Sequence, residues 1–155
     1  MSAPLRLVDG DGKERLRLWI RLLRVTREIE GELRERLKAG FATTLPRFDV
    51  MAALWRAPEG MMMSALSRFL LVSNGNVTGI VERLVADGLV ERTGRAGDRR
   101  ASIVRLTDAG RTAFAAMAAA NARWVDELLG GVSRDDARDV AAILAAFRSP
   151  WEDDQ

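Results

Sequence analysis

Residues 62–106 read MMSALSRFLLVSNGNVTGIVERLVADGLVERTGRAGDRRASIVRL, and this stretch decides the fold. It predicts a short helix at about 64–71, where apolar residues recur at helical spacing, followed by a turn at 72–75. Ser73 is placed to cap a second helix, which should end at Gly88, a residue that adopts the left-handed conformation easily. The side chains expected to be buried by the two helices are Leu66, Phe69, Leu70, Val77, Ile80, Val81, Leu84 and Val85.

After Gly88 the apolar period changes from helical to alternating. Segments 89–93 and 102–106 therefore predict two strands, and the basic, glycine-punctuated tip at 94–100 predicts a hairpin between them. Helix, tight turn, helix and hairpin together predict a winged helix-turn-helix. The fold class expected is α+β, mostly α.

Further helices are predicted on both sides of this stretch. One should run from Lys13 to Lys38 and end at Gly40, and the next should begin at Thr44–Pro46 and stop after Trp55. A long alanine-rich helix should run from Asp108 to about Leu129, and Ser133 should cap a last helix.

Composition excludes several classes of site. The chain has no cysteine and no histidine, so disulfides, thiolate metal sites and the commonest general base are absent. We therefore expect no enzyme activity, no cofactor and no metal site. The first residues lack the apolar core of a signal peptide, and no apolar run is long enough to cross a membrane, which predicts a cytoplasmic protein without a membrane partner.

The formal net charge is only +2, and lysine occurs only at Lys13 and Lys38. All other basic residues are arginines, which suit contacts to phosphate and guanine. The alternative is that a GC-rich genome favours arginine codons, so the bias is compatible with nucleic-acid binding and does not establish it.

The second helix of the motif should present small and polar side chains to the major groove of DNA, and the hairpin tip should reach the backbone or minor groove. Gly75 and Gly79 lie on one helix face and would let the backbone approach DNA closely. Helix capping by the asparagines and solvation of the arginines are the alternatives. The candidate DNA-binding residues are Ser73, Asn74, Asn76, Thr78, Arg83, Arg95, Asp98, Arg99 and Arg100.

The wing region resembles that of the MarR family of bacterial regulators. The resemblance is carried by LVER at 89–92, DRR at 98–100 and VRLTDAG at 104–110, and it covers nearly the whole chain. It implies a homodimer that places two recognition helices in successive major grooves of a palindromic double-stranded DNA operator. The wing has less proline and more glycine than many members, which leaves its minor-groove contact open.

Two other segments, TLPRFD at 44–49 and VSNGNVTG at 72–79, resemble a narrower group within this family, the regulators of hydroxycinnamate and aromatic-acid catabolism. This resemblance implies a small aromatic effector, either an aromatic acid or its CoA thioester. The whole chain, 1–155, is then one domain, with dimerisation helices at 13–40 and 108–148 and a DNA-binding lobe at 46–106.

Broad apolar faces on the terminal helices, including Trp19, Phe114, Trp124 and Phe147, also favour a dimer, although an intramolecular core would explain them too. Several apolar residues are candidates for lining an effector pocket between the terminal helices and the DNA-binding lobe. The alternative is that they belong to the ordinary hydrophobic core. Arg34, Arg36 and Lys38 would hold CoA phosphates, or simply complement the helix C-terminus. The candidate ligand-binding residues are Trp19, Leu23, Arg34, Arg36, Phe48, Met51, Met63 and Trp124.

These features predict a sequence-specific repressor of an aromatic-acid catabolic operon, released by its ligand. The alternatives are a transcriptional activator, a low-specificity winged-helix chromosome protein, a protein-only adaptor, and a hydrolase built on an Asp/Glu pair.

Overall fold

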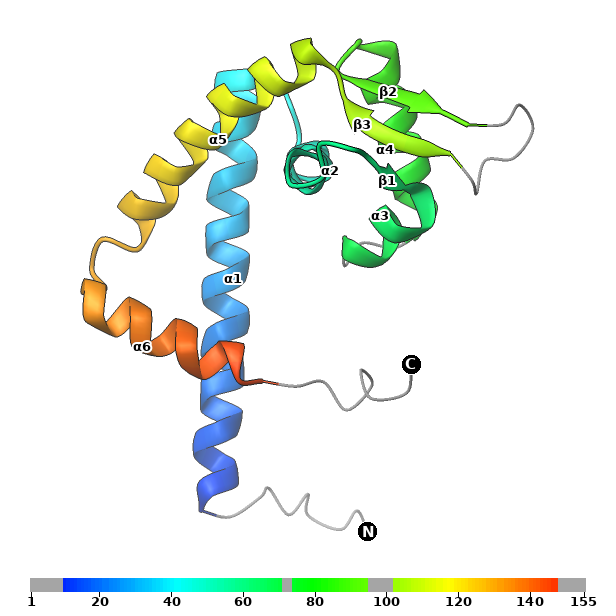
Figure 1. Cartoon of the computed structure of the whole chain (residues 1–155). Helices are drawn as coiled ribbons and strands as arrows, with labels where there is room; N and C mark the ends of the chain where they lie inside the picture. Colours follow the sequence, from blue (N-terminus) through cyan, green and yellow to red (C-terminus); the bar gives the residue numbers. More distant parts are fainter. Residues whose placement is uncertain (1–9, 71–73, 95–101, 148–155) are drawn as a thin grey trace, which may run out of the picture. The chain divides into compact units, whose positions relative to one another are not determined.

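The computed structural model describes residues 10–70, 74–94 and 102–147, and within them the side chains of all residues except 74 and 75. The chain forms two compact units, 1–121 and 122–155, and each is described by itself. The predicted class is confirmed: the described residues are mostly helical and contain one small antiparallel sheet (Figure 1). None of the described helices is both long and apolar enough to cross a membrane.

Helix α1, Asp11–Phe41, carries acidic residues in its first turn and Lys38 in its last, as the helix dipole favours. The predicted end at Gly40 is wrong. The helix continues to Phe41, and Ala42 adopts the left-handed conformation with φ 49°. With this turn, the backbone N–H of Ala42 donates to the carbonyl of Lys38, and the N–H of Thr43 donates to the carbonyl of Leu37.

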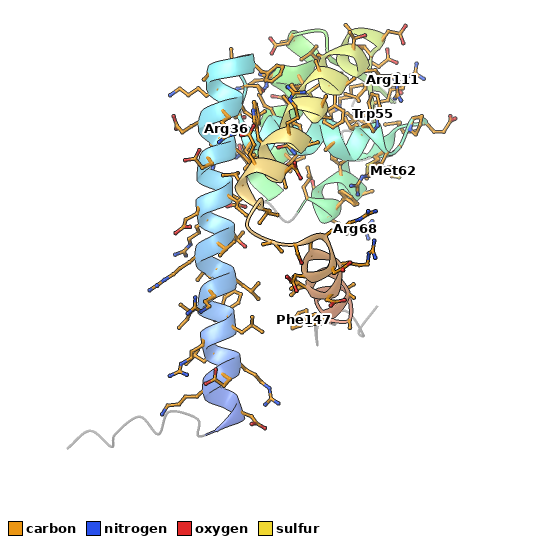
Figure 2. The ribbon with its side chains drawn as sticks, turned by 90° about the vertical axis from the view of Figure 1, so that its left-hand side faces the viewer. Arg36, Trp55, Met62, Arg68, Arg111 and Phe147 are labelled. Carbon is orange, nitrogen blue, oxygen red and sulfur yellow. The ribbon has the colours of Figure 1, made fainter. Side chains whose placement is uncertain are left out.

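Helix α2, Leu45–Trp55, begins as the sequence predicts, with the Thr44 side chain accepting a hydrogen bond from the backbone N–H of Arg47. Its aromatic side chains, the buried Phe48 and the partly exposed Trp55, form a cluster with α5, Asp108–Leu128. The ring of Phe114 lies 5.3 Å from that of Phe48 and 5.4 Å from that of Trp55, between centroids. The guanidinium of Arg111 stacks on the Trp55 ring at 4.7 Å (Figure 2).

The sheet has the order β1-β3-β2, with β1 at Met61–Met62, β2 at Val90–Thr93 and β3 at Ile103–Leu106. The predicted hairpin is confirmed, since β2 and β3 pair antiparallel with Glu91 opposite Arg105. Strand β1 was not predicted, and it pairs with β3 through only two residues.

The second unit contains the end of α5 and helix α6, Arg134–Ala145. Ser133 caps α6 as predicted, accepting a hydrogen bond from the backbone N–H of Asp136 at 3.1 Å. Every residue of α6 is exposed in this single chain, including Val140, Ile143 and Leu144. An amphipathic helix with an uncovered apolar face needs a further partner surface.

Candidate nucleic-acid interface

A short helix precedes the candidate recognition helix. This helix, α3, covers Met63–Phe69, and Leu66 and Leu70 are buried as predicted. Phe69 is 55% exposed, contrary to prediction, because it lies about 100° around the helix from the buried row. Helix α3 packs on the next helix, α4, so the two form a helix-turn-helix pair (Figure 1).

Helix α4, Asn74–Ala86, is held by one apolar row and presents the rest of its surface outward. The predicted end at Gly88 is confirmed by its φ of +75°. Burial of Val85 was predicted and is wrong: it is 39% exposed, because it lies one residue beyond the row. The buried residues of α4 are Val77, Ile80, Val81 and Leu84.

The outward side of α4 is polar and open. Asn76 and Arg83 are exposed and Thr78 is half-buried, so all three reach solvent. A Cβ atom added at Gly79 would meet nothing within 4 Å. The glycine therefore costs helix propensity without relieving any internal crowding, which leaves close approach by an external molecule as a reason for it.

An ion pair fixes the far end of α4 to α2. Arg47 donates from Nη2 to the Oδ2 atom of Asp87, 2.5 Å away. The Arg47 side chain is 21% exposed and that of Asp87 50%. Since Asp87 directly follows α4, this pair sets where the helix ends relative to the scaffold.

Strands β2 and β3 form the base of the wing next to α4. Glu91 and Arg105, opposite each other in the register, form an ion pair across the strands. At the outer end, a Cβ atom at Gly94 would lie 2.9 Å from the Cα atom of Ser102, so the strands approach closely there. Four predicted DNA-binding residues of the tip and the predicted helix cap lie outside the described residues: Arg95, Asp98, Arg99, Arg100 and Ser73.

The wing and α4 are joined to the start of α5 at Thr107. Its hydroxyl donates to the carbonyl of Gly88 at 2.7 Å and accepts from the N–H of Gly110 at 3.0 Å. A Cβ atom at Gly110 would lie 1.9 Å from the carbonyl oxygen of Leu89. Only glycine permits this contact, which makes α4, the wing and α5 one connected scaffold.

Comparison with known proteins identifies this arrangement. A family model described as MarR family matches residues 43–101. A MarR family transcriptional regulator from Silicibacter pomeroyi is 38% identical, and its crystal structure aligns over 88% of this chain and 95% of that one with a TM-score of 0.74. The chain belongs to the MarR family. Members of this family are transcriptional regulators, which confirms the prediction that the chain is not an enzyme.

Two other similarities are weaker. The transcriptional activatory protein BadR of Rhodopseudomonas palustris is 34% identical over 96 residues, which cover 60% of this MarR-family chain and 55% of BadR. A mutant MarR from E. coli, solved in complex with operator DNA, is 23% identical with a TM-score of 0.72, covering 88% and 97% of the two chains; it supports the fold alone. The chain spans less than two thirds of the length of the curated relatives it matches.

The predicted ligand-binding residues fall into separate places in this MarR-family chain. Phe48, Met51 and Met63 are buried in the core around α2. Trp19 is exposed on α1 and precedes the buried Leu33 by 14 residues, or roughly 21 Å of helix. Leu23 is half-buried on the same part of α1, and Trp124 belongs to the second unit.

The predicted anion-binding arginines lie one helical turn from acidic partners on α1. Arg34 pairs with Glu30 at 3.5 Å and Arg36 with Glu32 at 3.6 Å. The carboxyl group of Asp49 on α2 has a raised pKa because of its burial, and the negative charge of Glu30 raises it further. No cluster of three or more metal-ligating side chains occurs among residues 10–70, 74–94 and 102–147.

Proposed function

We propose that this MarR-family protein is a homodimeric, sequence-specific DNA-binding repressor that a small aromatic ligand releases from its operator. The observation that carries the proposal is the two-sided character of α4: four apolar side chains fix it to the scaffold, while Asn76, Thr78 and Arg83 remain accessible. A helix held in this way beside a β-hairpin can enter the major groove with its polar side first.

Residue chemistry assigns a role to each accessible side chain. The amide of Asn76 can read adenine, and Thr78 can contact a thymine methyl group or a phosphate. Arg83 can form a bidentate contact to guanine or hold a phosphate. Arg95, Asp98, Arg99 and Arg100 stand in the sequence between the two strands of the hairpin, where we expect an arginine to enter a narrow minor groove. Ser73 precedes α4 in the sequence and Asn74 is its first residue, so both are expected to meet a phosphate at the start of the helix.

A homodimer is supported by uncovered apolar side chains on the dimerisation segments, 13–40 and 108–148. Trp19 and Ile20 on α1 and Ile143 and Leu144 on α6 are all exposed in the single chain. Pairing two chains through these faces would remove that surface from water and repeat α4 by two-fold symmetry. The two half-sites would then be about one turn of DNA, ~34 Å, apart.

An aromatic acid or its CoA thioester is the effector that we propose, acting on an aromatic-acid catabolic operon. BadR, whose name records an activatory role, favours activation of transcription as the second candidate. The two candidates share the operator and differ in the effect on transcription.

Fluorescence anisotropy tests the repressor. The probe is labelled DNA from upstream of the protein's own gene, at fixed salt, with random-sequence competitor, titrated with p-coumarate and then with p-coumaroyl-CoA. Competitor-resistant binding that either compound reverses is the expected result. Binding no tighter than to random DNA would reject sequence-specific regulation in favour of a chromosome protein or an adaptor.

Variants test the recognition helix in the same assay. Asn76→Ala and Arg83→Ala should each cost about 1–3 kcal/mol and relax the preference at one base pair, while Arg99→Ala should weaken binding to all sequences. Arg56→Ala is the matched control, because it removes an exposed arginine at the end of α2, outside α4, the hairpin and both dimerisation segments. Full operator affinity in all three test variants would contradict the assigned interface.

A further inference from the structure

The charge of α1 differs between its two halves. Residues 13–27 hold six basic side chains and one acidic one, although the formal net charge of the whole chain is only +2. Residues 28–41 hold three basic and four acidic side chains, and there Arg34 pairs with Glu30 and Arg36 with Glu32. Positive charge is therefore concentrated in the first half of the helix.

Five of the six basic side chains of the first half lie on one side of α1. Since each residue turns a helix by about 100°, positions three and four apart line up, and these five span roughly 21 Å. All five are exposed, and the buried Leu33 and Leu37 lie on the opposite side of the helix. We call this set the basic stripe: Lys13, Arg17, Arg21, Arg24 and Arg27.

Side chains at the middle of the basic stripe surround a hollow of about 480 Å³. It is lined by Arg17, Ile20, Arg21, Arg24, Val25 and Glu28. Arg17 also pairs with Glu14 at 2.6 Å, whereas Arg21 and Arg24 make no ion pair within the part of the chain that the structure describes. Two unpaired guanidinium groups thus belong to the lining of an open hollow.

The basic stripe is unfavourable for the helix that carries it. Like charges three or four positions apart repel each other, and positive charge near the start of a helix opposes its dipole. Asp11 and Glu14 in the first turn offset only part of this repulsion. Solvation explains why the arginines are exposed but not why they gather on one side, so we look for a polyanion outside the chain.

The backbone of DNA suits the basic stripe better than a membrane surface does. Guanidinium groups bind phosphate through two parallel hydrogen bonds, and phosphates recur at regular intervals along a DNA strand. A helix that lies on a membrane buries its apolar side in the lipid, but the apolar side of α1 continues into the protein core at Leu33 and Leu37. The basic stripe therefore meets its partner through charge, which holds DNA without reading its sequence.

The basic stripe is also separate from the outward side of α4. Arg21 precedes the buried Leu33 by 12 residues, or roughly 18 Å of helix. Helix α1 packs on α2, and its first half extends beyond α2 as one continuous helix (Figure 1). A duplex held by α4 would therefore leave the basic stripe accessible to other DNA.

We propose that the basic stripe of α1 binds the phosphate backbone of a second DNA duplex, without sequence preference, while α4 holds the operator. The inference goes beyond the proposed regulator and rests on it for the first duplex. Because a homodimer carries the stripe twice, one regulator would bring two separate segments of DNA together.

The two lysines of α1 allow a test on the unaltered protein. Lys13 begins the basic stripe, and Lys38 lies 25 residues further along, or roughly 37 Å of helix. The full-length protein is saturated with one upstream duplex per dimer, and an excess of random-sequence duplex is added before acetylation with a sulfosuccinimidyl ester. Mass spectrometry should show acetylation of Lys13 slowed about fivefold or more by the random duplex, and that of Lys38, the internal control, unchanged.

Each other outcome of this test decides a different point. Operator binding without protection of Lys13 would overturn the basic stripe and leave the proposed regulator intact. Protection of Lys13 by the operator duplex alone would place both surfaces on one duplex and overturn the second one. Protection by phosphatidylglycerol vesicles and not by DNA would overturn DNA as the partner. Protection by DNA in a protein without operator preference would reject sequence-specific regulation and keep DNA binding by the stripe.

Arg21→Gln tests the charge at the middle of the basic stripe. Capture of a labelled random duplex by the operator-bound protein is measured by fluorescence anisotropy, and the parent should lose about a hundredfold in affinity between about 50 and 200 mM salt if roughly four phosphates are contacted. Arg21→Gln should weaken capture about fivefold at the lower salt and reduce the slope of log affinity against log salt by about one. Arg21→Lys should recover most of the capture.

Arg56→Gln, at the exposed end of α2, is the matched control and should keep both the capture and its salt dependence. Affinity for the operator itself should stay unchanged in Arg21→Gln. Unchanged capture in this variant would overturn the basic stripe. A parallel loss of operator affinity would show that Arg21 supports the fold or the dimer, and would overturn its assignment to a second duplex.

Discussion

Arg47 and Asp87 are 40 positions apart in the sequence, and the Arg47 Nη2 atom lies 2.5 Å from the Asp87 Oδ2 atom. The pair connects the first turn of α2 to the residue that follows α4. Because the arginine is mostly buried and the aspartate half-exposed, solvent screens their attraction less than it screens a fully exposed pair. The position of α4 therefore depends on a contact outside its outward, polar side.

A double-mutant cycle with Arg47→Ala and Asp87→Ala measures this contact. We expect a coupling energy of about 0.5–1 kcal/mol in urea unfolding, near the upper end for a partly exposed pair. The control cycle uses Glu14 and Arg17 on α1, whose side chains are 71% and 67% exposed, and should give about 0.2–0.5 kcal/mol. Equal coupling in the two cycles would show that Arg47 has no special hold on α4.

Gly110→Ala should disrupt the connection between the wing and α5. Its Cβ atom would lie 1.9 Å from the Leu89 carbonyl oxygen, and since that oxygen belongs to the backbone, the strand would have to move. We expect a loss of about 3 kcal/mol in the free energy of unfolding. Gly31→Ala on α1, where the added atom meets nothing within 4 Å, should instead gain about 0.5–1 kcal/mol. A small loss in Gly110→Ala would mean that the wing is free to adjust.

Much of the fold could be predicted because its determinants are local. Thr44 and Ser133 cap their helices through residues three positions ahead, and the hairpin strands alternate over a few residues. Strand β1 could not be predicted, since Met61–Met62 is too short to show alternation and pairs with a strand more than 40 positions later. Val85 was misassigned because the helical period places it at the border of the buried row.

The pKa of Asp49 is raised by burial and by the charge of Glu30, which makes folding stability depend on pH. Between the unfolded pKa, about 3.9, and the higher folded value, the folded state binds more protons. Stability therefore falls as pH rises through this window, and the cost of the buried charge is fully present above the folded pKa. Asp49→Asn should raise the melting temperature at pH 7, by an amount that shrinks as the pH is lowered toward 4.

Asp126→Asn, at an exposed position on α5, is the control for removal of one carboxylate. It should leave the melting temperature and its pH dependence close to those of the parent. If Asp49→Asn does not raise the melting temperature at pH 7, the folded protein accommodates the charge of Asp49 without cost to its stability.

Local sequence patterns determine the position of the candidate DNA-binding residues more fully than that of the candidate ligand-binding residues. The outward side of α4 follows from its own apolar row, so Asn76 and Arg83 could be placed on it from spacing alone. Arg34, Arg36 and Lys38 were predicted together from their place in the last turns of α1, and the structure shows that Arg34, Lys38 and residues 42–46 line a hollow of about 500 Å³ whereas Arg36 does not. That hollow depends on how the chain turns at Ala42, which no local pattern specified.

Gly79→Ala separates the stability of α4 from its access to DNA. The added methyl group meets open space, so the substitution should stabilise the fold by about 0.5–1 kcal/mol through helix propensity. If the α4 backbone approaches DNA closely at this position, the same methyl group should weaken operator binding about tenfold, measured by anisotropy beside thermal unfolding. Gly31→Ala, where the added atom also meets nothing within 4 Å in the single chain, should gain similar stability and so measures the helix-propensity part of the effect. A Gly79→Ala protein that is more stable and binds operator as tightly as the parent would place the DNA contact elsewhere on α4.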